Sequence, residues 1–285
     1  MGDNVKNNYI RPPKDINLPF FAYGILKPGE IAYSRIKDCI YDKNEVIVHH
    51  AMKHRDGVPI LMPKENDYAE TSGFIFYFND NMEAYKKIGQ VISYKLYKWG
   101  TIKIGSERVN VLFGKNPLDG SNNIESPSDR NCYTGREDPL FKEGLELVKE
   151  NLKSGHFNWE KGFFNLQMNY MLLWSAIDRY CKLKYNRKKE HENREELSND
   201  KLFIDALEKY AGGKHYRTLF TADDLSERVF DLENPLYCLN YYYTLRCNIV
   251  HRGKTSMRDI DLLEEATNDL LNIFEYILKK TFNEE

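Results

Sequence analysis

The sequence predicts an α+β protein in which a small mixed β-barrel precedes an all-α helical bundle. Residues 18–115 contain short runs of β-branched and aromatic residues that are separated by turn signals. Residues 138–285 instead place apolar side chains at the i, i+3, i+4, i+7 spacing of amphipathic helices. Residues 116–137, between these regions, hold several Gly and Pro turns and few apolar residues, which indicates a linker.

The composition excludes several classes of protein. The 285 residues include 41 Lys and Arg against 43 Asp and Glu, so the formal net charge of −2 argues against a surface that is basic throughout. Hydrophobic residues make up 41% of the chain, which is enough for real cores, and no apolar run has the length of a membrane span. The five cysteines form no CxxC pair and no signal-peptide pattern opens the chain, so a cytoplasmic protein is expected.

The first half is expected to begin with a polar, loosely held arm at residues 1–17. Strands are then predicted at 20–26, 45–52, 73–78, 94–104 and 108–113. One short helix is predicted in this half, at 82–89.

The second half is expected to be helical throughout. Helices are predicted at 140–154, 163–185, 201–211, 235–251 and 259–282. The stretch 182–196 carries many charges of both signs, and we interpret it as a solvated helix end and loop in preference to an RNA-binding patch.

The first candidate site is the run Tyr23, Gly24, Ile25 and Leu26, which ends a strand and precedes a Pro-Gly turn. A glycine directly after a strand lets backbone N–H groups approach a small anionic ligand. Together with HHAMKHRDGVPILMP, ETSGFIFYF and the helix and strands that follow, this run resembles the γ-glutamylcyclotransferase-like fold, which includes the AIG2-like proteins. The resemblance implies that these four residues bind a small γ-glutamyl-like ligand.

The family's catalytic acid is missing from the matching position. In the family a Glu after the short helix moves the proton as the α-amine attacks the γ-amide carbonyl. This sequence has Gly89-Gln90 there, and Gln cannot act as a general base near neutral pH. The resemblance therefore implies a degenerate domain that senses a ligand or serves as a scaffold. The alternative is a γ-glutamylamine-type cyclotransferase that uses another acid, Glu83 or Glu70, with the helices as a dimerisation module.

The second candidate site lies in YYYTLRCNIVHRGK, residues 241–254. A lone cation such as Arg246 in an aromatic segment costs free energy unless it is paired or used. On a helix Arg246 and His251 lie about 140° apart. They meet only if the Arg reaches around, if the helix frays before Gly253, or if a second copy packs across them. The alternative is an ordinary helix C-terminus, where His and Arg favour the negative end of the dipole and Gly253 caps it.

This segment resembles the Arg-x4-6-His motif of HEPN domains, and FNLQMNYMLLWSAIDRYCKLKY resembles their long early helix. HEPN domains are commonly dimeric helical bundles, and many are metal-independent ribonucleases, some of them toxins or defence effectors. The resemblance implies that Arg246, Asn248 and His251 are catalytic and that no cofactor is needed. His251 would transfer protons, Arg246 would stabilise charge in the transition state and Asn248 would orient the phosphate. The residue after the Arg, which is usually polar, is Cys247 in this chain.

The leading prediction is thus a homodimeric, metal-independent endoribonuclease that carries a degenerate ligand-sensing domain. The cyclotransferase described above is one alternative. A non-catalytic binding or adaptor protein, in which both sites are inactive, is another. No metal site is expected from His49, His50 and His54, because no carboxylate or Cys partner is evident. Exposure of Arg246 and His251 in a groove would favour the nuclease, whereas burial of both would favour the adaptor.

Overall fold

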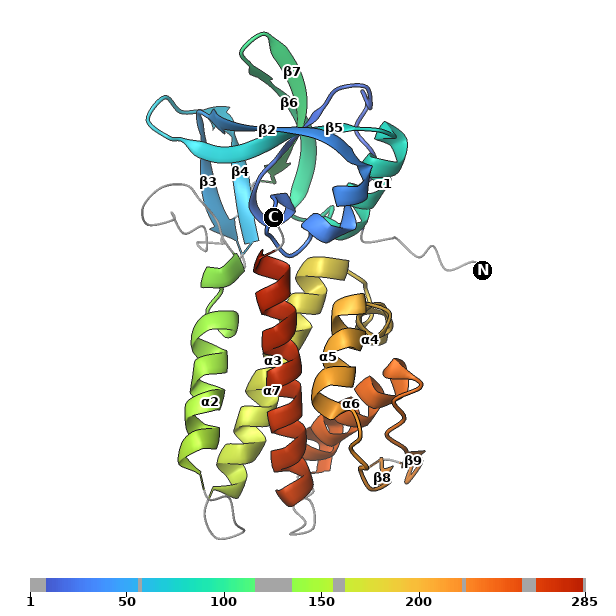
Figure 1. Cartoon of the computed structure of the whole chain (residues 1–285). Coiled ribbons are helices and arrows are strands. Elements are labelled where there is room, and N and C mark those ends of the chain that lie inside the picture. The colour runs from blue at the N-terminus through green and yellow to red at the C-terminus, as the bar shows by residue number, and fades with distance from the viewer. Residues whose placement is uncertain are drawn as a thin grey trace, which may run out of the picture. The chain divides into compact units, whose positions relative to one another are not determined.

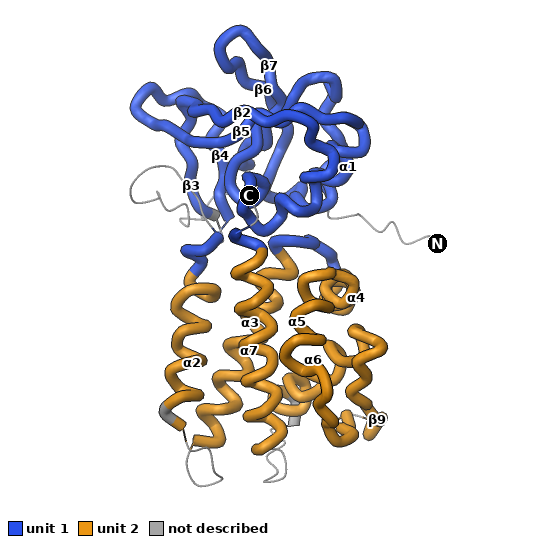
Figure 2. Tube along the Cα trace, viewed as in Figure 1, with its two compact units in different colours: residues 1–138, 183–188, 281–285 blue, residues 139–182, 189–280 orange. Residues whose placement is uncertain are grey.

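A computed structural model describes the chain over the residue ranges 9–55, 58–115, 135–155, 162–221, 224–252 and 260–283. The chain forms two compact units, which Figure 2 distinguishes by colour. Unit 1 comprises residues 1–138, 183–188 and 281–285, and unit 2 comprises residues 139–182 and 189–280.

Unit 1 is built on a mixed sheet of seven strands that curls into half a barrel (Figure 1). The strands are β1 (Phe20–Ala22), β2 (Ile40–Val48), β3 (His50–Arg55), β4 (Val58–Glu65), β5 (Thr71–Phe78), β6 (Tyr97–Ile104) and β7 (Glu107–Gly114). Their order is β2-β5-β1-β7-β4-β3, and β6 also pairs with β7. β7 runs parallel to β1 and β4, and the other pairs are antiparallel. The α+β class is confirmed, but the predicted barrel is half a barrel, with β2 and β3 at the two ends of the strand order.

The observed strands differ from the strands predicted from sequence in two places. The run at 45–52 is divided between β2 and β3, and His49 separates them. β4 was not predicted from periodicity, and its prolines Pro59 and Pro63 account for this because proline cannot donate to a strand ladder. The first four residues of β4 are nevertheless buried, and the strand pairs with β3.

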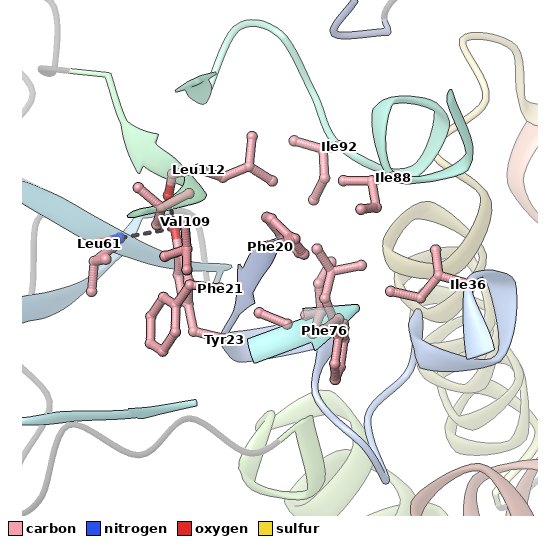
Figure 3. Close-up of a cluster of buried hydrophobic side chains, with 14 of the residues drawn as sticks. Phe20, Phe21, Tyr23, Ile36, Leu61, Phe76, Ile88, Ile92, Val109 and Leu112 are labelled. Atoms are coloured by element: carbon pink, nitrogen blue, oxygen red, sulfur yellow. Dashed lines mark hydrogen bonds between the residues drawn. The ribbon is translucent and has the colours of Figure 1, made fainter. Parts of the chain in front are cut away.

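The core of unit 1 lies between the sheet and helix α1 (Asn81–Val91) (Figure 3). Phe20 and Phe76 from the sheet and Ile88 from the helix are all fully buried in it. The helix begins after Asp80, whose side chain accepts a hydrogen bond of 3.0 Å from Glu83 N and so caps the first turn. The predicted short helix is thus present, and it covers the apolar face of the sheet.

The described part of the N-terminal arm, 9–17, is attached to unit 1. Ile10 N donates a 3.1 Å hydrogen bond to Gly89 O, and Trp99 Nε1 donates one of 2.6 Å to Arg11 O. Gly89 allows this close approach, because a Cβ at that position would lie 2.2 Å from Ile10 O. The polar composition of the arm predicts a loosely held segment, but its backbone N–H and C=O groups form hydrogen bonds with α1 and β6.

Unit 2 is predominantly helical. Its helices are α2 (Leu145–Ser154), α3 (Phe163–Tyr185), α4 (Glu190–Ser198), α5 (Lys201–Ala211), α6 (Pro235–Arg252) and α7 (Ile260–Asn283), and the last turns of α3 and α7 belong to unit 1. A π-helical turn at Leu140–Gly144 precedes α2. Tyr180 of α3 meets Phe274 of α7 edge to face, and Tyr170 of α3 donates a hydrogen bond to Tyr242 O of α6. None of the described helices combines the length and the apolar character that crossing a membrane would need.

Two features of unit 2 correct the sequence prediction. A two-stranded hairpin, β8 (Leu219–Phe220) with β9 (Glu227–Arg228), interrupts the expected all-α bundle; such short strands leave no detectable period in the sequence. The charged stretch 182–196 contains most of a helix, α4, rather than only a helix end and loop. Most of the predicted linker, 116–134, lies outside the described residues, and Gly135–Glu137 forms a 3-10 turn.

We expect Gly89→Ala to detach the N-terminal segment 9–17 from α1, because the added methyl group would collide with Ile10 O. Limited trypsin digestion should then cut after Lys14 several-fold faster than in the wild type. Lys86→Ala, an exposed substitution on the same helix, is the control and should leave the rate unchanged. Equal cleavage of all three proteins would contradict the role assigned to Gly89.

Candidate functional site

The predicted ligand-binding run Tyr23–Leu26 forms a buried turn directly after β1. Its last three residues make a single 3-10 turn, and Gly24 has a φ of +60°, in the left-handed region. A Cβ at Gly24 would also lie 2.3 Å from Cγ of Pro59. Both the backbone angle and the available space therefore require glycine at this position.

The side chain of Tyr23 joins two strands of the sheet and is only 6% exposed (Figure 3). Its hydroxyl donates a 2.5 Å hydrogen bond to Leu112 O of β7 and accepts one of 3.0 Å from Leu61 N of β4. Burial raises the pKa of Tyr23, so the hydroxyl remains protonated and able to donate. Tyr23 thus has a structural role, and the predicted ligand would be held by the backbone of the turn.

The acids considered for cyclotransferase chemistry are both exposed. Glu83 lies in the first turn of α1, where its carboxylate is 3.9 Å from Lys87 Nζ. Glu70 precedes β5. Gln90, at the family's acid position, is half-buried. Among the described contacts, none joins these side chains to the turn after Tyr23.

Helix α6 carries the second set of predicted residues. The helix is unbroken from Pro235 to Arg252, so fraying between Arg246 and His251 does not bring them together. The backbone of His251 continues the helix, and its side chain lies outside the described residues. Tyr241 and Tyr242 are fully buried and belong to the core.

Arg246 is half-buried and lies against an aromatic ring. Its guanidinium carbon is 5.6 Å from the ring centroid of Tyr243, one turn towards the N-terminus of α6. His251 lies in the opposite direction, about 7.5 Å further along the helix axis. Within one chain Arg246 is therefore directed away from His251, which leaves a second copy of the chain as the way to combine them.

Asn248 is buried at the side of α6 that faces the hairpin. Its Nδ2 donates a 3.0 Å hydrogen bond to Phe220 O of β8, and its Oδ1 has no hydrogen-bond partner among the described residues. One of the two N–H donors of the amide, which the predicted phosphate-orienting role requires, is used within the fold. Asn248 therefore fixes α6 to β8 in this structure.

Sequence reasoning missed Arg194 of α4, which packs against the ring of Tyr243. The guanidinium carbon of Arg194 lies 3.6 Å from the centroid of that ring, and its Nε donates to Asn240 Oδ1 at 3.3 Å. Glu190 accepts a 3.0 Å hydrogen bond from the Tyr243 hydroxyl and lies 3.9 Å from Arg194 Nη1. The four-residue spacing of Glu190 and Arg194 was the available signal, since such pairs meet on a helix.

Asp178 of α3 was also missed. Burial raises the pKa of Asp178 to about 6, with a further increase from Glu190 and opposing effects of Arg246 and Arg194. Burial, with smaller contributions from Cys247 and Glu190, raises the pKa of Tyr243 to about 12. The signal for Asp178 in the sequence was an acid inside a long apolar helix, which parallels the argument made for Arg246.

These residues form one charged group, the Tyr243 cluster, which consists of Tyr243, Arg194, Arg246, Glu190 and Asp178. Two guanidinium groups near one ring can bind a phosphate through parallel N–H donors. The two carboxylates offset the repulsion between the arginines when no anion is bound. In the described part of the chain, no three His, Cys, Asp or Glu side chains gather as they would around a metal ion.

No family model matches the chain, and searches of curated proteins and of solved structures find no match. The functional interpretation therefore depends on the geometry of the two units.

Replacing Tyr23 with Phe should lower the free energy of unfolding by about 1–3 kcal/mol, because buried Leu61 N–H and Leu112 C=O both lose their bond to the hydroxyl. Urea denaturation followed by circular dichroism measures the change. Tyr68→Phe is the matched control, since Tyr68 is fully exposed. Equal stability of Tyr23→Phe and the wild type would show that the hydroxyl is not a structural bridge.

Asp178→Asn should raise the thermal unfolding midpoint near pH 8 and leave it unchanged near pH 4. The folded-state pKa of about 6 lies above the unfolded carboxyl value of about 3.9, so the wild type loses stability as the pH rises between these values. Thermal melts across this range test the prediction, with Asp205→Asn on α5, whose side chain is 39% exposed, as control. A gap between Asp178→Asn and the wild type that does not change with pH would refute it.

Proposed function

We propose that unit 2 is a metal-independent endoribonuclease of the HEPN type, in which Arg246 and His251 of α6 carry the chemistry. The observation that supports this most directly is the environment of Arg246. Its guanidinium carbon lies 5.6 Å from the centroid of the Tyr243 ring and in the field of the half-buried Asp178. Arg246 also precedes a histidine by five residues on an unbroken helix. A cation held in this way is oriented for an anion before the anion arrives.

RNA supplies its own nucleophile for this reaction. The 2′-oxygen forms a bond to the adjacent phosphorus, the bond from phosphorus to the 5′-oxygen breaks, and the products are a 2′,3′-cyclic phosphate and a 5′-hydroxyl. One proton leaves the 2′-hydroxyl and one arrives at the 5′-oxygen. Imidazole, with an unperturbed pKa of about 6.5, suits either transfer, and Arg246 stabilises the charge on the phosphoryl oxygens.

Two copies of the chain are needed in this proposal. In a symmetric dimer with antiparallel α6 helices, Arg246 of one subunit lies near His251 of the partner subunit, and the reverse pair forms at the same interface. This arrangement overcomes the separation of the two residues on one helix. The helical unit then acts both as the dimerisation element and as the nuclease.

For unit 1 we propose the role of a degenerate γ-glutamylcyclotransferase-like domain that senses a small ligand. Its acid position is Gly89-Gln90, and the backbone of Ile10 occupies the space above Gly89. The turn at Gly24 keeps the left-handed glycine conformation, with a φ of +60°, directly after β1.

Arg246→Ala should reduce cleavage of a single-stranded RNA in the presence of EDTA by about 10²–10³-fold, because the transition-state charge loses its donors. His251→Ala should reduce it by about 10²–10⁴-fold through loss of proton transfer. Lys201→Ala, which removes an exposed cation of α5, is the control and should cleave at the wild-type rate. Wild-type rates in both α6 variants would rule out the proposed site, and an inactive wild type would favour the adaptor.

Mixing the two inactive variants tests whether the site is shared between subunits. A heterodimer of Arg246→Ala and His251→Ala contains one intact Arg–His pair, so an equal mixture should recover about a quarter of the wild-type activity after subunit exchange. A mixture as inactive as either variant alone, with heterodimers shown by native mass spectrometry, would place each site within one chain.

A further inference from the structure

Strand β2 lies at one end of the strand order of unit 1 and, among the described strands, pairs only with β5 (Figure 1). Its register with β5 is regular from Asp42 to Val48, and a bulge between Ile40 and Asp42 interrupts it. Residues 41–45 and Ile47 are exposed. An edge strand of this kind presents a row of backbone N–H and C=O groups with which a further strand can pair.

The backbone of Lys43 shows which residues face the open edge. Its N–H donates a 2.9 Å hydrogen bond to Oδ1 of Asp42, the side chain of the preceding residue. A strand N–H that takes a side-chain acceptor points away from the neighbouring strand, and both backbone groups of a residue point to the same side of an antiparallel strand. Lys43 and Glu45 therefore present their backbone groups to the open edge, whereas those of Asn44 point towards β5.

The side chains of Lys43 and Glu45 lie on one face of the sheet. Their partners in β5 are Phe76 and Phe74, which are two residues apart and so share a face. On this face Lys43 Nζ is 5.8 Å from the ring centroid of Tyr33, which packs against Phe76. The open edge thus carries one positive and one negative side chain next to each other on the same face.

The order of these two charges fits a second copy of the same strand. When two β2 strands run antiparallel about a two-fold axis at Asn44, Lys43 of each copy lies opposite Glu45 of the other, and both pairs are of opposite sign. An axis at Lys43 or at Glu45 would instead place two like charges opposite each other. Charged residues on an edge usually prevent strand pairing, but in this one register they attract.

We infer that the edge of β2 is an interface between two copies of this chain, in which residues 42–46 pair antiparallel about Asn44. The backbone groups of Lys43 and Glu45 exchange hydrogen bonds across this interface. The N–H of Lys43 then has a carbonyl oxygen of the second copy as its acceptor in place of the Asp42 side chain.

Two large apolar side chains flank the paired stretch, Tyr41 and Ile47, which are 64% and 58% exposed. In the antiparallel pair Ile47 of each copy reaches the end at which the other copy carries Tyr41, so the contact removes apolar surface from water. The interface lies in unit 1 and does not depend on the dimer proposed for α6. Both contacts are two-fold, so a chain that forms both assembles beyond a dimer.

Disulfide cross-linking of the full-length protein tests the register. The two Asn44 residues form a non-hydrogen-bonded pair with Cα atoms about 4.5 Å apart, which a disulfide can span. Asn44→Cys protein, oxidised in air with copper phenanthroline, should give more covalent dimer on a non-reducing gel than the wild type. Asp42→Cys is the matched control, because the two copies of residue 42 are offset by roughly 13 Å along the strand. Equal dimer from both variants, or none above the wild type from Asn44→Cys, overturns the inference.

Charge reversal in the Asn44→Cys background tests the two ion pairs. Lys43→Glu and Glu45→Lys, each added alone, place like charges opposite each other and should lower the yield of covalent dimer several-fold. An equal mixture of these two variants should regain the yield, because two carboxylates of one copy then meet two ammonium groups of the other, and such recovery excludes a folding defect. Lys98→Glu, the same change at an exposed position of β6, is the control. Unchanged yields in the single variants, or no recovery in the mixture, would contradict the register.

RNA cleavage separates this inference from the proposed function. Lys43→Glu protein should cleave RNA at the wild-type rate, because Lys43 lies in unit 1 and the proposed chemistry lies in unit 2. If Asn44→Cys protein cross-links specifically and the wild type cleaves no RNA, the edge interface stands and the nuclease fails. If the wild type cleaves RNA and cross-linking shows no preference for Asn44→Cys over Asp42→Cys, the nuclease stands and the edge interface fails.

Discussion

The stacking of Arg194 on the ring of Tyr243 is the contact on which the helical site depends. It joins α4 to α6 and brings one guanidinium group to a ring that Arg246 also approaches. Two like charges so close together need opposing charge, and Glu190 and the half-buried Asp178 provide it. The positive and negative charges of the cluster offset one another without a ligand. The cluster still has two guanidinium groups, that of Arg246 and that of Arg194, which borders a cavity of about 650 Å³.

Periodicity in the sequence was sufficient to predict α3, α5, α6 and α7, because each carries a long apolar stripe. The same signal placed Arg246 on a buried helix and identified it as an unusual cation. Periodicity did not reveal Arg194, because the charged helix α4 has no apolar stripe. It did not reveal the role of Asp178 either, because the charged side chains near Asp178 come from α4 and α6. The cavity could not be predicted because it depends on the hairpin of β8 and β9, where only two residues pair on each side.

In unit 1, too, the local sequence predicts some elements, while contacts between distant segments determine the rest. Local sequence predicts β1, β5, β6, β7 and α1, and it gives one run at 45–52 where the structure has parts of β2 and β3. The half-barrel depends on the parallel pairing of β7 with β1 and β4. Tyr23 was expected at a ligand, but its hydroxyl joins β4 and β7. Gly89 was interpreted through a missing acid, and the structure adds a different reason for the glycine, the crossing of Ile10 above it. Such contacts between distant segments leave no mark in a local pattern.

The central claim is that α6 supports cleavage of RNA by attack of the RNA's own 2′-oxygen. The chemical ends of the products test this claim most directly. A short RNA of defined sequence is incubated with the protein in EDTA, and the fragments are identified by mass spectrometry. We predict 5′ fragments that end in a 2′,3′-cyclic phosphate and 3′ fragments that begin with a 5′-hydroxyl. Fragments with 3′-hydroxyl and 5′-phosphate ends, or cleavage of the same strand with 2′-deoxy residues throughout, would contradict the claim.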